Sequence, residues 1–163
     1  MIISIASGKG GTGKTTIAVN MALSLNENVN LFDLDVEEPN CKIFINAPAK
    51  TIETVYVDIP AIDKSKCLLC SKCVDFCRFN ALTKTKKGIL LFEELCHSCG
   101  GCQLVCPAQA ITNVQKEVGH INFSQKDAFC FYEGMLNIGY PVAGTVISAT
   151  KKYIHADKIN ILD

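Results

Sequence analysis

Two short apolar runs flank a stretch of helical character in the first part of the chain, and this pattern predicts an α/β fold. Residues 2–6 (IISIA) and 29–32 (VNLF) have the length and character of buried strands. The stretch between them is rich in Ala and Leu and predicts a helix that contains Ile17, Val19, Met21, Leu23 and Leu25. A strand, a helix and a second strand in this order indicate a parallel sheet covered by helices.

The later part of the chain continues the same alternation of strand and helix patterns. We expect strands over residues 119–123 and 158–162, a turn and strand over 133–139, and a helix that begins at Pro141 and ends at Tyr153. The middle differs, because residues 81–85 and 88–92 flank a Lys-Lys-Gly turn and predict a small hairpin.

A strand over residues 51–59 leads into this middle region and should end at Pro60. Residues 110–113 should close the region again. The pattern therefore predicts three segments along the chain: 1–60, 61–115 and 116–163.

A glycine-rich segment separates the first predicted strand from the first predicted helix. Residues 8–15 (GKGGTGKT) match G-x4-G-K-T, and this strand and helix are the context that makes the pattern a P-loop. Its backbone N–H groups curl around phosphates at the positive end of the helix dipole. Lys14 should reach the β- and γ-phosphates, and Thr15 should offer its hydroxyl to Mg²⁺. The expected nucleotide-binding residues are Gly8, Gly10, Gly11, Thr12, Gly13, Lys14, Thr15 and Thr16.

Two acids, Asp33 and Asp35, follow the second predicted strand. Binding sites of α/β sheets form at the carboxyl ends of strands, so we expect these acids beside the P-loop. There they would lie near Mg²⁺ and the attacking water. The alternative is that they are ordinary solvated charges at a strand end.

Eight of the ten cysteines form two runs with the same spacing, C-x2-C-x2-C-x3-C. In bacterial two-cluster ferredoxins, which have this spacing, the fourth cysteine of each run ligates the other cluster. The sequence therefore predicts two 4Fe-4S clusters. One would be held by Cys67, Cys70, Cys73 and Cys106, and the other by Cys96, Cys99, Cys102 and Cys77.

Zinc sites and disulfides are the alternatives for these cysteines. Zinc ligands usually come in pairs separated by longer gaps, and disulfides belong with a secretion signal, which the N-terminus lacks. Cys41 and Cys130 lie outside both runs and are expected to be buried free thiols. His97 lies between two expected ligands and should be a polar loop residue, or tune the cluster through a hydrogen bond.

Composition narrows the function classes further. The formal net charge is +0 and the lysines are scattered, which argues against nucleic-acid binding. No apolar run reaches the roughly 18 residues that a membrane crossing needs. Many cysteines without a secretion signal indicate a reducing compartment, the cytoplasm.

The P-loop has an additional lysine, Lys9, and resembles the deviant Walker A motif of the MinD/ParA class of P-loop ATPases. Residues 33–40 (DLDVEEPN) and the two cysteine runs are similar to the MinD-superfamily subgroup with an inserted ferredoxin domain. The resemblance covers essentially the whole chain. It implies a MinD-like P-loop parallel sheet, formed by residues 1–60 and 116–163, with an inserted α+β bacterial-type ferredoxin domain at 61–115.

The resemblance also implies roles for single residues. Lys9 would reach across a nucleotide-sandwich homodimer to the partner's phosphates, and Asp35 would be the switch acid that positions water; with Lys14 they are the expected catalytic residues. Asp33 would lie near the Mg²⁺ that Thr15 binds. Asp163 matches the family's switch II acid, a further Mg²⁺ residue, after which the family's sheet continues. The sheet is therefore expected to be incomplete at the C-terminus, and the chain is expected to be the N-terminal portion of a longer protein. This portion alone is not expected to be a competent ATPase.

Three functions remain open from the sequence. The first is an ATPase whose nucleotide state is coupled, through two 4Fe-4S clusters, to electron transfer or contact with a redox partner protein. The second is a non-hydrolysing electron carrier or iron–sulfur cluster assembly protein that only binds ATP. The third and weakest is a partitioning or positioning protein, against which the cysteine runs argue.

Overall fold

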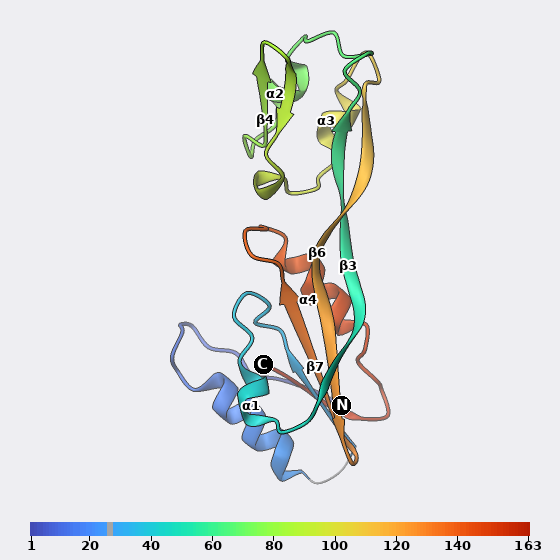
Figure 1. The fold of residues 1–163 in the computed structure, drawn as a ribbon. Helices are drawn as coiled ribbons and strands as arrows, with labels where there is room; N and C mark the ends of the chain where they lie inside the picture. Colours follow the sequence, from blue (N-terminus) through green and yellow to red (C-terminus); the bar gives the residue numbers. More distant parts are fainter. Residues whose placement is uncertain (26–27) are drawn as a thin grey trace. The chain divides into compact units, whose positions relative to one another are not determined.

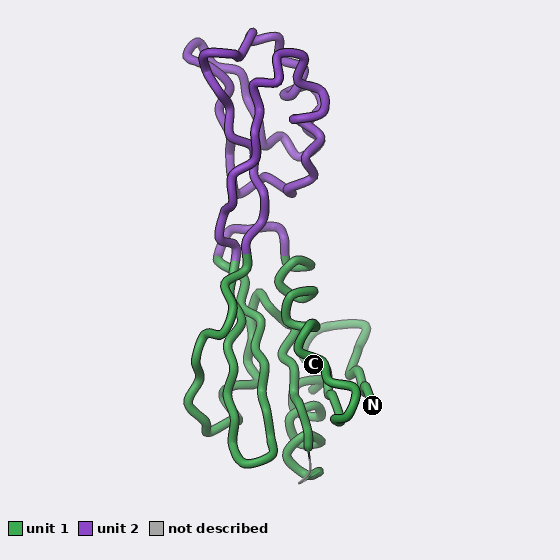
Figure 2. Tube along the Cα trace, turned by 90° about the vertical axis from the view of Figure 1, so that its right-hand side faces the viewer, with its two compact units in different colours: residues 1–55, 119–137, 143–163 green, residues 56–118, 138–142 purple. Residues whose placement is uncertain are grey.

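The computed structural model describes residues 1–25 and 28–163, and the chain divides into two compact units. Unit 1 contains Met1–Val55, Gly119–Asn137 and Ala143–Asp163, and unit 2 contains Tyr56–Val118 and Ile138–Val142 (Figure 2). Each unit is therefore assembled from separate stretches of the sequence.

A six-stranded sheet has the order β1-β8-β2-β7-β6-β3 (Figure 1). In this spatial order the strands are Ile2–Ser4, Ile159–Leu162, Val29–Asp33, Phe129–Leu136, Ile111–Lys126 and Ala49–Ile62. The pairs β1–β8, β8–β2 and β2–β7 are parallel, whereas β6 and β7 are antiparallel. The expected α/β fold is confirmed, but the sheet is mixed and mostly parallel because β6 and β7 form a hairpin.

Helices cover both faces of the sheet in unit 1. Helix α1 (Lys14–Ser24) packs through Ala18, Val19 and Ala22 on the face that carries Leu31 and Ile161. Helix α4 (Ala143–Lys151) lies over the opposite face, where Gly134 approaches Val146 and Thr150. All five residues of β2 are buried, as expected for a strand with helices on both sides.

Unit 2 contains short elements around the cysteine runs. Strands β4 (Leu82–Thr85) and β5 (Gly88–Leu91) form the predicted antiparallel hairpin. The helices are α2 (Lys72–Phe76) and α3 (Gly101–Leu104), with a 3₁₀ turn at Glu93–Leu95. Cys73, Leu82, Ile89 and Ile111 form the buried core, and four further cysteines, which are partly buried, pack against it.

Several element boundaries differ from the sequence prediction. β3 continues through Pro60 to Ile62, which is tolerated because β3 is an edge strand. Residues 110–113 and 119–123 mostly belong to one continuous strand, β6. β7 begins at Phe129, earlier than predicted, because the hairpin turn lies at Asp127, whose φ is 53°. Helix α4 is shorter than predicted at both ends.

We predict that Gly134→Ala lowers the free energy of unfolding by about 1–3 kcal/mol. A Cβ atom at this position of β7 would lie 2.5 Å from the Thr150 Oγ1 atom and 2.8 Å from the Val36 Cγ1 atom. Gly144→Ala in α4 is the matched control, since its Cβ would meet no atom within 4 Å. Denaturation followed by circular dichroism should show Gly144→Ala at or slightly above wild type; equal destabilisation of both variants would contradict the packing argument.

Candidate functional site

The parallel strands bring three chain segments to one edge of the sheet. The glycine-rich loop follows β1, Asp33 ends β2, and Asp163 follows β8. Strand β8 lies between β1 and β2, and the ladder extends to Asp163, whose N–H donates to the Phe32 carbonyl (3.0 Å). Asp163 therefore lies between the segments that lead to the loop and to Asp33, although more than a hundred residues separate it from either.

The glycine-rich loop is held by its own polar groups. Thr12 Oγ1 donates to Ser7 Oγ (2.8 Å), and Ser7 Oγ donates to the Lys9 carbonyl (2.7 Å). Gly11 and Gly13 have φ values of 72° and 86°, a region that favours glycine. Lys14 and Thr15 occupy the first turn of α1, whose N-cap is Gly13. The predicted strand, loop and helix around this motif are confirmed.

The carboxylate of Asp33 is fully buried and accepts three backbone N–H groups. Asp33 Oδ1 accepts from Asp35 (3.2 Å), and Asp33 Oδ2 accepts from Asn40 and Cys41 (2.9 Å each). These bonds fold the segment after β2 back toward the strand end, where a 3₁₀ helix runs from Cys41 to Phe44. Asp33 is thus a structural anchor of this loop as well as a candidate ligand.

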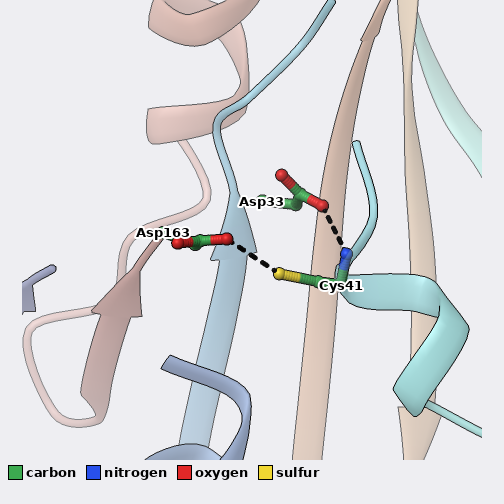
Figure 3. Close-up of side chains that lie close together, drawn as sticks. All are labelled: Asp33, Cys41 and Asp163. Carbon is green, nitrogen blue, oxygen red and sulfur yellow. Dashed lines mark hydrogen bonds between the residues drawn. The ribbon is translucent and has the colours of Figure 1, made fainter. Parts of the chain in front are cut away.

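Cys41 connects Asp33 with Asp163 (Figure 3). Its backbone N–H donates to Asp33, and its thiol donates to Asp163 Oδ2 with a sulfur–oxygen distance of 3.4 Å. Ligand atoms of the three residues lie within 4.8 Å of one another, which is close enough for one metal ion. Asp163 Oδ1 is buried and has no hydrogen-bond partner among the described residues.

Burial favours the protonated, neutral forms of Asp33 and Cys41. It raises the pKa of Asp33 to about 6, against the lowering effect of the N–H groups of Cys41 and Asp35; the charge of Asp163 raises it further. Burial also raises the pKa of the Cys41 thiol far above its usual range, and both carboxylates add to this. The thiol is therefore protonated at neutral pH and acts as a hydrogen-bond donor.

The other residues expected at this edge are more open. Asp35 is exposed and lies outside the group formed by Asp33, Cys41 and Asp163. Lys9, Gly8, Gly10 and Thr16 are exposed, whereas Lys14 and Thr15 are half-buried. The edge thus combines open loop positions, where a nucleotide has access, with the buried carboxylate of Asp33 and the half-buried Asp163.

In unit 2, the eight cysteines of the two runs line two separate recesses. One recess is lined by Cys67, Cys70, Cys73 and Cys106, together with Leu68 and Ile111 among others. The other is lined by Cys77, Cys96, Cys99 and Cys102, together with Phe79 and His97 among others. In each recess, three cysteines come from one run and the fourth comes from the other.

The backbone of the two runs repeats the same unusual conformations. Leu69 and Ser98, which precede the second cysteine of each run, have φ values of 51° and 54°. Ser71 and Gly100, which follow that cysteine, have φ values of 67° and 70°. Left-handed conformations cost non-glycine residues about 1–2 kcal/mol each. Their recurrence at equivalent positions indicates that the loops are shaped around a requirement common to both runs.

The donor set fits a bound metal centre better than bare thiols. All ten cysteines are free, and burial raises the pKa of the thiols of Cys73, Cys96 and Cys102. Thiolates at these positions therefore need a nearby positive charge to replace lost hydration, and a metal centre supplies it. Cys70 and Cys99 are exposed, so each recess opens to solvent on one side.

Comparison with known proteins identifies the family. The sequence pattern of the CobQ/CobB/MinD/ParA nucleotide-binding domain matches residues 3–160. The chain belongs to this family. The MinD/ParA fold therefore accounts for the sheet and the glycine-rich loop, and it is also the family expected from the deviant Walker A motif.

Relatives of this MinD/ParA chain fall into two groups. The uncharacterized protein MJ0579 of Methanocaldococcus jannaschii is 30% identical over 100% of this chain and 60% of its own length, so the chain spans less than two thirds of it. Shorter matches include the iron–sulfur cluster carrier protein of Synechocystis sp., 40% identical over 32% of this chain and 16% of its own length. Pyruvate synthase subunit PorD of M. jannaschii is 34% identical over 36% of this chain and 69% of its own length.

Two features of the MinD/ParA chain were not evident from the sequence. Cys41 was expected only as a buried thiol, and nothing in its spacing indicates the hydrogen bond to Asp163. The rings of His97 and Phe79, which both line one recess, stack with centroids 3.8 Å apart. Both contacts join residues from separate segments, which sequence spacing alone does not reveal.

No helix of residues 1–25 and 28–163 has the length and apolar composition to cross a membrane.

We predict that the Asp33 carboxyl titrates near pH 6, about two units above an ordinary aspartate. Carbon-13 NMR of labelled aspartate carboxyl groups should show one resonance with this midpoint, and Asp33→Asn should remove it. A bound cation favours the ionised form, so Mg²⁺ with ATP should lower the midpoint by about one unit or more. Cation affinity should accordingly be highest above pH 6 and fall as Asp33 is protonated; a midpoint near 4 without Mg²⁺ would contradict the burial argument.

Proposed function

We propose that this protein is an ATP-binding iron–sulfur protein. It binds ATP with Mg²⁺ at the P-loop and carries two 4Fe-4S clusters in the ferredoxin-like middle segment. The nucleotide state is coupled to electron transfer, or to contact with a redox partner protein, through the clusters. The observation that carries the proposal is the grouping of eight cysteines into two sets of four within a MinD/ParA chain.

The nucleotide half of the proposal rests on the loop at the sheet edge. Lys14 and the loop N–H groups bind the phosphates, and Thr15 with Asp33 and Asp163 holds Mg²⁺ through oxygen ligands, which this ion prefers. Bound Mg²⁺ neutralises phosphate charge. Asp35, which is exposed beside this set, positions the water that converts ATP to ADP and phosphate. Lys9 reaches the phosphates of the second subunit in a nucleotide-sandwich homodimer.

The cluster half rests on the crossed arrangement of the cysteines. Cys67, Cys70 and Cys73 hold one cluster with Cys106, and Cys96, Cys99 and Cys102 hold the other with Cys77. The clusters supply one-electron redox chemistry when bound. The exposed positions of Cys70 and Cys99 give each recess an open side at which a partner protein can approach. A reducing compartment, the cytoplasm, suits these ligands.

Hydrolysis belongs to the whole protein in this proposal, since the chain spans 60% of the length of MJ0579. A second candidate is a cluster carrier that binds ATP without using it for electron transfer. The similarity to an iron–sulfur cluster carrier protein favours it. The two candidate functions predict different behaviour of the bound iron. A carrier transfers clusters to an acceptor apoprotein, whereas the primary proposal predicts that iron stays bound during ATP-dependent electron transfer.

We predict about eight irons and eight acid-labile sulfides per chain in anaerobically prepared protein, with electron paramagnetic resonance signals of reduced 4Fe-4S clusters. Double substitutions test the crossed assignment. Cys77→Ser with Cys99→Ser removes two ligands of one recess and should leave about four irons. Cys70→Ser with Cys77→Ser removes one ligand from each recess and should leave almost none.

If each run held its own cluster, these two results would be exchanged. Zinc without sulfide would refute the cluster proposal altogether. Cys130→Ser is the control, because this buried cysteine lies outside both recesses and should leave the iron content unchanged.

We predict that Lys14→Ala weakens ATP binding at least about tenfold, since it removes a charged phosphate contact. Lys9→Ala should leave binding by one subunit nearly unchanged but abolish ATP hydrolysis by the whole protein. Calorimetric titration with ATP and phosphate release measure the two effects. Lys64→Ala, an exposed lysine that is not part of the P-loop sequence, is the control; equal effects of Lys14→Ala and Lys64→Ala would refute the proposed phosphate site.

A further inference from the structure

Cys41 makes two hydrogen bonds that reach the ends of two neighbouring strands. Its N–H donates to Asp33 at the end of β2, and its thiol donates to Asp163 after β8. The side chain is 0% exposed and packs in the core beneath α1. Packing alone does not require a hydrogen bond between a thiol and a carboxylate. The Cys41–Asp163 hydrogen bond therefore indicates a role for this thiol beyond packing.

The hydrogen bonds leave few acceptor positions open at the two carboxylates. Both oxygens of Asp33 accept backbone N–H groups, and Asp163 Oδ2 accepts the Cys41 thiol. Asp163 Oδ1 is buried without a partner among the described residues. An unpartnered buried oxygen is costly unless a ligand or water satisfies it. The thiol therefore fixes which oxygen of Asp163 is presented.

We propose that Cys41 is a positioning residue for the Mg²⁺ site. Its thiol would orient the Asp163 carboxylate so that Oδ1, the oxygen without a hydrogen-bond partner, faces the Mg²⁺ ion that Thr15, Asp33 and Asp163 would hold. Through its backbone, the same residue ties the start of the 3₁₀ helix Cys41–Phe44 to Asp33. Gain or loss of Mg²⁺ is thereby transmitted to the loop after β2. This inference rests on the proposed nucleotide site and extends it to a residue that never touches the nucleotide.

Cys130 provides a matched comparison within the same unit. It is also a buried thiol, 5% exposed, but its sulfur accepts a hydrogen bond from Lys158 Nζ (3.7 Å) and packs beside aromatic rings. It makes no contact with Asp33 or Asp163 among the described hydrogen bonds. Substitution of Cys130 therefore removes a buried thiol without removing the carboxylate contact.

The test measures the Mg²⁺ concentration that half-saturates binding of a fluorescent ATP analogue. Cys41→Ala and Cys41→Val, which lack the donor, should raise it about three- to tenfold, the loss expected for one hydrogen bond. Cys41→Ser, which keeps a donor, should remain within about twofold of wild type, as should Cys130→Ala. Binding of the analogue in the presence of EDTA should be the same in all variants.

Valine fills the space of the thiol, so Cys41→Val carries the comparison if Cys41→Ala does not fold. An unchanged Mg²⁺ requirement in both variants, or equal weakening with and without Mg²⁺, overturns the positioning role. If wild-type protein binds the analogue but shows no dependence on Mg²⁺, the positioning role is again wrong. If wild-type protein does not bind the analogue at all, the proposed nucleotide site fails and the inference fails with it.

Discussion

The parallel pairing of β1, β8 and β2 is the constraint that brings the glycine-rich loop, Asp33 and Asp163 to one edge of the sheet. Parallel neighbours end at the same side of a sheet, so residues that follow these strands meet although they are far apart in sequence. The ladder continues past β8, where the Asp163 N–H donates to Phe32 and the Leu34 N–H donates to Asp163. This continuation fixes the backbone of Asp163 next to that of Asp33 and leaves only the side chains to be oriented.

The cysteine recesses depend mainly on the local conformation of the backbone. Each run places three sulfurs around one recess through left-handed residues on both sides of the second cysteine. The fourth sulfur comes from the other run, so neither recess is complete until both runs have folded. The hairpin of β4 and β5 lies between the runs in sequence, and its Leu82 and Ile89 supply the core against which the cysteines pack.

Much of the fold could be predicted because its signals are local. The apolar runs of β1, β2 and β8, the glycine loop and the β4–β5 hairpin each follow from a short stretch of sequence. The hairpin of β6 and β7 was misplaced because its turn uses Asp127 in a left-handed conformation instead of a glycine signal. Asp33 and Asp163 were expected at the site, but the role of Cys41 was not, because it depends on a contact between the ends of two different strands.

Burial of an ionised carboxylate or thiolate without a nearby cation costs free energy. Both candidate sites contain buried groups of these types. At the sheet edge, three backbone N–H groups offset part of the desolvation of Asp33, yet its pKa remains raised. In the recesses, burial likewise raises the pKa of several thiols. Under the proposed function, cation binding would release the protons that burial retains, so occupancy of each site would depend on pH and would stabilise the surrounding loops. Under that proposal, the order of the loops at each site would depend on the ligand bound there, which is the local property that a nucleotide-dependent or metal-dependent switch requires.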